Sequence, residues 1–220
     1  MKMMHWRGFW IVLAGLLFGH GLLIIDATVI LRYINAMHTP WLDFVMVWST
    51  RIVQAPLIVF LFVLIGVLVN KRAFVLSLIS FTVAGLSAQA LKRFVFSDRL
   101  RPHAVLDYES WHRVEGFALA ENFSFPSGHS AVAFAIALSV VVSASSKSKP
   151  VKGIALCIAF VIGFSRMYLL MHFYHDVFAG MLLGLLSAGI VYRLLDRHLQ
   201  HALWGTSLHH GILSKSQKRQ

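Results

Sequence analysis

Long apolar segments recur along this chain of 220 residues, and they constrain its fold more than any other feature. A helix needs about 20 apolar residues to cross the ~30 Å hydrocarbon core of a bilayer. Hydrophobic residues make up 58% of the chain and charged residues 13%, whereas soluble domains carry about 25% charged residues. We therefore predict an all-α, polytopic membrane protein with six spans, at Phe9–Ile25, Ala55–Val69, Ala73–Leu91, Ser130–Ser145, Val151–Leu170 and Asp176–Leu195.

The first apolar segment looks like the core of a signal peptide, because Lys2 and Arg7 precede it. No small-residue cleavage site follows and further spans do, so we interpret it as a signal anchor that stays in place. The second span is short, and we expect it either to extend before Pro56 or to tilt among its neighbours. We predict one six-span membrane domain over residues 1–197 and a basic cytoplasmic tail over residues 198–220.

The stretch between the first two spans, Asp26–Gln54, is amphipathic and is predicted to form helices at the membrane surface. Thr39 followed by Pro40 marks a helix start, with the threonine as cap and the proline in the first turn. A carboxylate close to hydrocarbon, such as Asp26, is a functional candidate by default. We favour the simpler interpretation that Asp26 caps a helix beginning at Ala27.

Lysines and arginines mark one side of the predicted bundle. They precede the first span, join the second to the third and the fourth to the fifth, and follow the sixth, as Lys2, Arg7, Lys71, Arg72, Lys147, Lys149, Lys152, Arg193, Arg197, Lys215, Lys218 and Arg219. The positive-inside rule makes that side the cytoplasm, so both termini are predicted to be cytoplasmic in a bacterial-type inner (plasma) membrane. The loop Lys92–Ser127 then lies on the periplasmic or outer face, where its own cations break the rule and suggest another use.

The net charge of +11 is an orientation signal and favours contact with anionic lipid headgroups. No nucleic-acid partner is expected, because the charges flank spans rather than forming one soluble face. The sequence favours no particular oligomeric state.

Three segments place polar groups at the same outer level, and the last of them holds His172 and Asp176, four residues apart. On a helix these two side chains would share one face. The carboxylate would accept the proton on one imidazole nitrogen and leave the other nitrogen as a nucleophile. Arg166 would lie off this face on a continuous helix, but a turn near Met171 would bring its guanidinium back to hold phosphate oxygens.

The other two segments supply an anion site and further cations. Ser127 and Gly128 lie where the fourth span begins, so unpaired backbone N–H groups point outward there, with the serine hydroxyl as a further donor. His129 follows as a candidate general acid for a leaving oxygen. In the first segment, Lys92 or the arginine after it, together with Arg101, would neutralise charge that develops during phosphoryl transfer.

Each of these residues, taken singly, has a simpler structural interpretation. A histidine near a membrane interface is usually hydrogen-bonded or snorkelling, and we assign that role to His103, His112 and His175. Arginine and lysine at span ends usually anchor the helix. The convergence of two histidines, an aspartate, a Ser-Gly cap and several cations on one face favours a phosphate site. Because the constellation lacks paired carboxylates, no metal is predicted.

These segments resemble the three motifs of the type 2 phosphatidic acid phosphatase superfamily, which also includes bacterial acid phosphatases and vanadium haloperoxidases. The second motif matches as Pro126-Ser127-Gly128-His129. The third matches with every spacing kept, as Ser165-Arg166, His172 and Asp176.

The first motif, Lys-x6-Arg-Pro, is matched in part. Arg101-Pro102 is present, but Phe94 stands where the family has lysine. We infer a two-residue insertion with Lys92 still serving, while Arg93 or Arg99 remains an alternative.

The resemblance implies a six-span fold and a mechanism without metal or cofactor. In that mechanism His172 attacks phosphorus to form a phosphohistidine, Asp176 orients it, and His129 protonates the leaving group before water hydrolyses the intermediate. The residues implied to hold the phosphate are Lys92, Arg101, Ser127, Gly128 and Arg166.

The leading hypothesis is an integral membrane lipid phosphatase. Its substrate would be a phosphomonoester or diphosphate such as phosphatidic acid, phosphatidylglycerophosphate, a polyprenyl diphosphate or a lipid A phosphate. The aromatic loop Asp107–Phe123 would lie on the membrane and admit the headgroup, or would only anchor there.

Three alternatives were weighed against this hypothesis. A phosphotransferase with a polyprenyl diphosphate donor would share the first half-reaction. A non-catalytic lipid-binding or transport protein is expected to lack the nucleophile or the acid, and both are present. The membrane architecture disfavours a vanadate-dependent oxidase.

Overall fold

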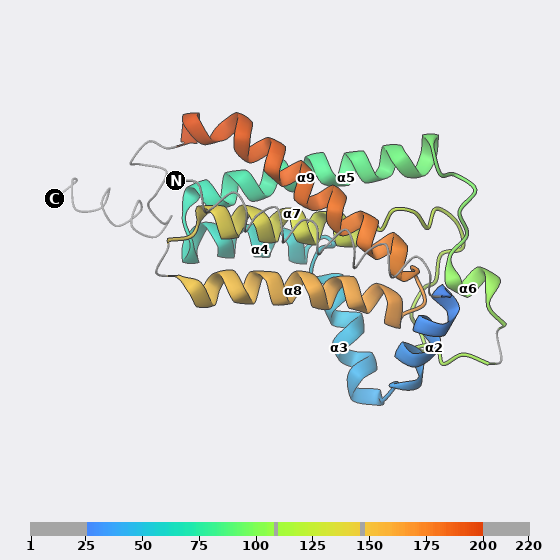
Figure 1. Ribbon diagram of the computed structural model, residues 1–220. Helices are drawn as coiled ribbons and strands as arrows, with labels where there is room; N and C mark the ends of the chain where they lie inside the picture. Colours follow the sequence, from blue (N-terminus) through green and yellow to red (C-terminus); the bar gives the residue numbers. More distant parts are fainter. Residues whose placement is uncertain (1–25, 108–109, 146–147, 200–220) are drawn as a thin grey trace, which may run out of the picture.

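The computed structural model describes residues 26–107, 110–145 and 148–199, and within these ranges all regular structure is helical (Figure 1). Five of the described helices lie alongside one another as a bundle, and three short ones lie at one end of it (Figure 1). The bundle helices are α4 (Leu57–Leu68), α5 (Lys71–Phe94), α7 (Gly128–Ser143), α8 (Lys149–Tyr168) and α9 (Tyr174–Leu199), and the short ones are α2 (Ala27–Ala36), α3 (Pro40–Arg51) and α6 (Pro102–Val105). The prediction of an all-α fold is confirmed for this part of the chain.

Helices α5, α8 and α9 are long and apolar enough to cross a membrane, over Lys71–Phe94, Lys149–Tyr168 and Tyr174–Leu195. Helices α4 and α7 are shorter apolar helices. Large apolar side chains remain exposed on the outside of the bundle, among them Phe60, Leu68, Leu86, Phe160, Leu186 and Leu194. Such a surface is typical of a protein surrounded by lipid. The five helices overlap five predicted spans, whereas Phe9–Ile25 and most of the predicted tail lie outside the described residues.

Helix α4 differs from the expectation that the second span extends before Pro56. It begins at Leu57, directly after the proline, and residues 52–56 form turns. A proline cannot donate its backbone nitrogen to a helical hydrogen bond, so the chain turns here. The turn carries Gln54 to the end of the bundle where the short helices lie.

The caps of α2 and α3 follow the sequence predictions. The Asp26 carboxylate accepts a 2.8 Å hydrogen bond from the backbone N–H of Thr28. The Thr39 hydroxyl accepts one of 3.2 Å from the N–H of Leu42, with Pro40 in the first turn. Asp26 is therefore explained as a helix cap.

The loop between α6 and α7 is held against α2 and α3. The Asn35 side chain exchanges two hydrogen bonds with the backbone of His112, at 2.8 and 3.0 Å. The His112 ring reaches the Asp43 carboxylate at 3.0 Å, which agrees with its assigned structural role. Trp111 is only 7% exposed and packs with Leu31 and other core residues, so it does not lie on the membrane as an anchor.

Helices α7 and α9 approach each other closely because α9 carries glycine where they meet. A Cβ atom added at Gly180 would lie 2.3 Å from the carbonyl oxygen of Ser127, and one at Gly184 would lie 2.1 Å from that of Ala131. Small residues four apart allow this kind of backbone approach between membrane helices. The contact brings the start of α7 against the start of α9, where the predicted site residues lie.

Candidate active site

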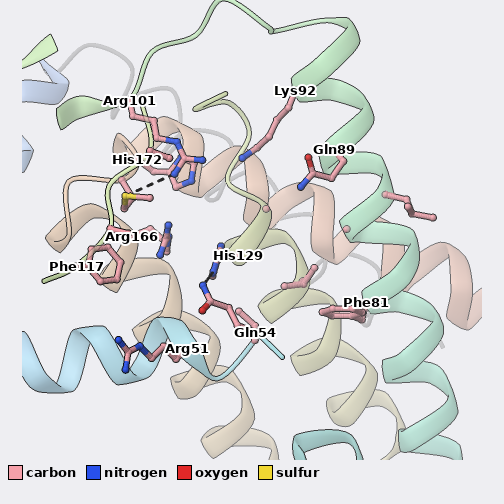
Figure 2. Close-up of a pocket in the computed structure, with 18 of the residues that line it drawn as sticks. Arg51, Gln54, Phe81, Gln89, Lys92, Arg101, Phe117, His129, Arg166 and His172 are labelled. Carbon is pink, nitrogen blue, oxygen red and sulfur yellow. Dashed lines mark hydrogen bonds between the residues drawn. The ribbon is translucent and has the colours of Figure 1, made fainter. Parts of the chain in front are cut away.

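A cavity of about 760 Å³ opens at the end of the bundle near the short helices. Six of the eight predicted site residues line it, namely Lys92, Arg101, Gly128, His129, Arg166 and His172. Figure 2 shows the side chains of Lys92, Arg101 and Arg166 converging around His172. Asp176 and Ser127 are fully buried behind this lining. The structure thus brings the three separate motif segments to one place.

The expectation that His172 and Asp176 share a helix is wrong in detail, although the pair does form. His172 lies in the turn before α9, and Nδ1 of its ring is 3.5 Å from Oδ2 of Asp176. The same carboxylate oxygen accepts a 3.0 Å hydrogen bond from the backbone N–H of Phe173, which caps the helix. Asp176 is therefore fixed by the start of its own helix while its carboxylate faces the imidazole.

Ser124 is a third member of this group that the sequence analysis missed. Its hydroxyl donates a 2.6 Å hydrogen bond to Oδ2 of Asp176 and lies 3.4 Å from Nδ1 of His172. Its side chain is buried. The only signal in the sequence was its place two residues before Pro126, and no spacing rule links that position to Asp176.

A break between α8 and α9 returns Arg166 to the site, as the sequence predicted for a turn near Met171. Leu170 has a positive φ of 53°. The backbone N–H groups of Met171 and His172 both donate to the carbonyl of Arg166, at 2.9 and 3.1 Å. The Arg166 guanidinium donates to the hydroxyl of Thr50, which holds it beside the cavity.

Three of the cations that line the cavity form no ion pair with a carboxylate in the described part of the chain. Among the described residues, neither Lys92, Arg101 nor Arg166 has a carboxylate within ion-pairing distance. Arg101 instead donates from Nε to the carbonyl of Asn122, at 2.9 Å. The Nε atom of Arg166 is buried and has no hydrogen-bond partner among the residues that the structure describes. Buried or partly buried cations that lack a direct ion pair make a strong site for an anion with several oxygens.

Of the candidates for the first cation, the structure places Lys92 in the cavity. The buried residues of α5 recur every three or four positions along one stripe, and Lys92 ends that stripe after Ala84 and Ala88. Lys92 is 6% exposed. Arg93, the next residue, points to the exposed side of α5, and Arg99 is exposed and does not line the cavity.

The start of α7 combines a capped helix end with an open glycine. The Ser127 hydroxyl accepts hydrogen bonds from the backbone N–H and the hydroxyl of Ser130, at 3.4 and 2.9 Å. The Ser127 N–H donates to the carbonyl of Asp176 at 2.9 Å. Gly128 lines the cavity, and a Cβ there would meet only Ala88 at 4.0 Å. Glycine is therefore not required for packing, and its backbone is open to a ligand.

His129 lies beside Gln54, a residue outside all three motifs. Nε2 of its ring is 3.0 Å from Nε2 of the Gln54 amide, and both side chains line the cavity (Figure 2). The other histidines considered structural lie elsewhere. His175 is 3.3 Å from Oδ1 of Asp176 on the side away from His172, and neither it nor His103 lines this cavity.

The charge state of His172 follows from its surroundings. Burial, together with the positive charges of Arg166, Lys92 and Arg101, lowers the pKa of His172 well below the ordinary imidazole value. The ring is therefore neutral at pH 7, which is the form that carries a nucleophilic lone pair. No group of three or more His, Cys, Asp or Glu side chains that could hold a metal occurs within the described ranges.

Comparison with known proteins gives a consistent result. Residues 73–200 match the family model described as the PAP2 superfamily. The chain is 34% identical over 159 residues to phosphatidylglycerophosphatase B of Bacillus subtilis (strain 168), which covers 67% of this chain and 72% of that protein.

Two solved structures are similar to this one. LpxE of Aquifex aeolicus has a TM-score of 0.64 at 27% identity, covering 74% of this chain and 93% of that one. A transmembrane PAP2-type phosphatidylglycerolphosphate phosphatase from Bacillus subtilis has a TM-score of 0.61 at 28% identity, covering 86% and 98%.

Proposed function

Because this chain belongs to the PAP2 superfamily, we propose that it is a membrane lipid phosphatase that hydrolyses a phosphomonoester or diphosphate of a lipid. One observation supports this proposal above the others. A buried histidine backed by a carboxylate lies among three cations that form no ion pair with any carboxylate in the described ranges. That arrangement suits a nucleophile that attacks a phosphate held by positive charge.

In the proposed reaction, Nε2 of His172 attacks phosphorus and the bond from phosphorus to the leaving oxygen breaks. Asp176 accepts a hydrogen bond from Nδ1–H without taking the proton, and its charge stabilises the positive charge that develops on the ring. His129 gives a proton to the leaving oxygen. Water then attacks the phosphohistidine, His129 takes a proton from that water, and inorganic phosphate leaves.

The phosphate oxygens are proposed to be held by Lys92, Arg101 and Arg166 together with the N–H groups at the start of α7. Cations aimed at the equatorial oxygens stabilise the transition state of phosphoryl transfer electrostatically. Divalent metals supply the same stabilisation in other phosphatases. We therefore propose that activity persists in a metal chelator. The Ser127 hydroxyl already caps α7. Ser127 is therefore proposed to contribute by holding the start of this helix, whose N–H groups bind the phosphate.

The site is proposed to lie at headgroup level on the outer face of a bacterial-type inner membrane. This placement rests on the six spans and cytoplasmic termini predicted from the sequence, and it would put the short helices α2, α3 and α6 on the same outer face. The exposed Trp41 and Trp48 of α3 suit a membrane–water interface there.

The proposed substrates remain those with a phosphate at the end of a membrane lipid. Phosphatidylglycerophosphate is the first to test, since the similar sequence and one similar solved structure, both from Bacillus subtilis, are named for it. The protein would be purified in detergent with EDTA and assayed for phosphate release from four candidates: this lipid, phosphatidic acid, a polyprenyl diphosphate and a lipid A phosphate.

Wild type would be compared with His172→Ala and Asp176→Asn, and with His38→Ala as a histidine that does not line the cavity. Release in EDTA that is lost only in the two site variants supports the proposal. Release that requires a lipid acceptor would favour the phosphotransferase. Full activity in His172→Ala would show that His172 is not the nucleophile.

A further inference from the structure

Gln54 lies in the turn between α3 and α4 and makes the hydrogen bond to the His129 ring seen in Figure 2, with 3.0 Å between the two Nε2 atoms. Within the described residues, no other side chain hydrogen-bonds to that ring. We propose that Gln54 is a positioning residue, which orients His129 and selects the nitrogen that gives its proton to the leaving oxygen. This inference rests on the proposed function and adds a residue that none of the three motifs contains.

Both partners are anchored by their backbones. The N–H of Gln54 donates to the carbonyl of Arg51 at 2.9 Å, and the carbonyl of Gln54 accepts from the N–H of Ile58 at 3.0 Å. Val53, the residue before Gln54, is buried in the core. His129 is the second residue of α7, and the residue that caps this helix is tied to α9 through the carbonyl of Asp176. The contact therefore joins two fixed points across the cavity.

The chemistry of the amide suits a ring that changes its protonation state. An amide offers N–H donors on one side and a carbonyl acceptor on the other, so a half-turn exchanges them at the same place. In this structure the amide N–H group donates to Nε2 of His129, which leaves the ring proton on Nδ1. When the ring is protonated on both nitrogens, the turned amide accepts from Nε2–H.

The proton then follows one path. When a phosphate anion binds beside it, His129 takes a second proton from solvent onto Nε2. Nδ1–H of this imidazolium then donates to the leaving oxygen as the bond to phosphorus breaks, and the departing alcohol is neutral. His129 is left neutral with its remaining proton on Nε2, held by the Gln54 carbonyl. The lone pair on Nδ1 is then free to take a proton from the water that attacks the phosphohistidine. Asp176 and Gln54 thus orient the two histidines, each through one ring nitrogen.

The test compares two single-chain lipid phosphates with similar tails, an alkyl phosphate and an alkyl-nitrophenyl phosphate. An alkoxide is a poor leaving group and needs a proton, whereas a nitrophenolate leaves as a stable anion. Because kcat/KM covers the steps up to release of the leaving group, its ratio for the two esters reports help from the acid. His129→Ala gives the reference loss, about 100-fold to 10,000-fold for a general acid.

Gln54→Leu is expected to lower kcat/KM for the alkyl ester about tenfold, the effect of one lost hydrogen bond, and to leave the nitrophenyl ester within about threefold of wild type. Activity on the nitrophenyl ester also shows that the variant is folded. Gln54→Glu keeps an acceptor for Nε2–H and is expected to preserve the wild-type ratio of the two esters. Gln89→Leu is the matched control, because Gln89 lines the same cavity without a hydrogen bond to His129, and it is expected to leave the ratio unchanged.

Equal losses on the two esters in Gln54→Leu would overturn the proposal, since they would indicate a role in structure or phosphate binding. An unchanged alkyl ester rate would overturn it as well, and so would a shift in the ratio of the same size in Gln89→Leu. Failure of the wild type to cleave either ester, or any lipid phosphate, would instead contradict the proposed function.

Discussion

The substitution Gly180→Ala tests how closely catalysis depends on the contact between α7 and α9. The new Cβ would lie 2.3 Å from the carbonyl oxygen of Ser127 and 3.1 Å from Cβ of Ser130. The nearest contact must open from 2.3 Å to at least 3.0 Å, so the two backbones must separate by at least 0.7 Å. Overpacking of this kind costs about 1–3 kcal/mol of stability.

The separation falls between the two halves of the site. Gly128 and His129 follow Ser127, whereas Asp176 lies one turn before Gly180 and accepts the 2.9 Å hydrogen bond from Ser127 through its carbonyl. A displacement of about 1 Å between reacting groups can cost about 100-fold in rate. We therefore expect kcat/KM for phosphate release in detergent to fall by about 10-fold to 100-fold.

Gly189→Ala is the matched control, because it lies on the same helix and an added Cβ meets nothing within 4 Å. It is expected to keep wild-type activity and thermal stability. If Gly180→Ala retained activity within about twofold of Gly189→Ala, the claim that this close approach sets the site geometry would be refuted.

Three further predictions follow from the site. Ser124→Ala removes the 2.6 Å hydrogen bond to Asp176 and is expected to lower kcat/KM by about 10-fold to 100-fold. Ser110→Ala removes a 2.6 Å hydrogen bond to an exposed aspartate and should leave kcat/KM unchanged. Equal losses in the two variants would contradict the prediction. Lys92→Gln should lower kcat/KM by about 100-fold or more, and Arg93→Gln by less than about threefold. A larger loss in Arg93→Gln than in Lys92→Gln would show that Lys92 is not the cation that binds the phosphate. Because burial and nearby cations lower the pKa of His172, its ring should stay neutral as pH falls through 6.5. Nitrogen NMR of labelled histidine would measure this, and protonation of the ring at pH 6.5 or above would contradict the prediction. The unfolded chain does take up that proton, so this histidine should destabilise the fold below about pH 6.5.

Much of the fold was predictable because it depends on local patterns. Apolar length located five described helices, and the caps at Asp26 and Thr39 follow from side chains that bind the next turn of backbone. Lys92 was also predictable in principle, since it continues the three-and-four spacing of small residues on the buried stripe of α5.

The site was predictable only where its parts are close in sequence. The pairing of His172 with Asp176 was predicted from their spacing, although the reason given was wrong, because α9 begins after His172. Ser124 and Gln54 make contacts across 52 and 75 residues, and no periodicity reports such pairs. The burial of Trp111 depends in the same way on its packing against α2 and the turn after α8.

The most direct test of the account is a search for the covalent intermediate. Wild type and His172→Ala would be mixed with a lipid substrate labelled in its terminal phosphate, then denatured in alkali and digested for mass spectrometry. We predict an acid-labile, alkali-stable phosphoryl group on His172 of the wild type and none in the variant. A labelled residue other than His172, or a variant that still releases phosphate, would contradict the central claim.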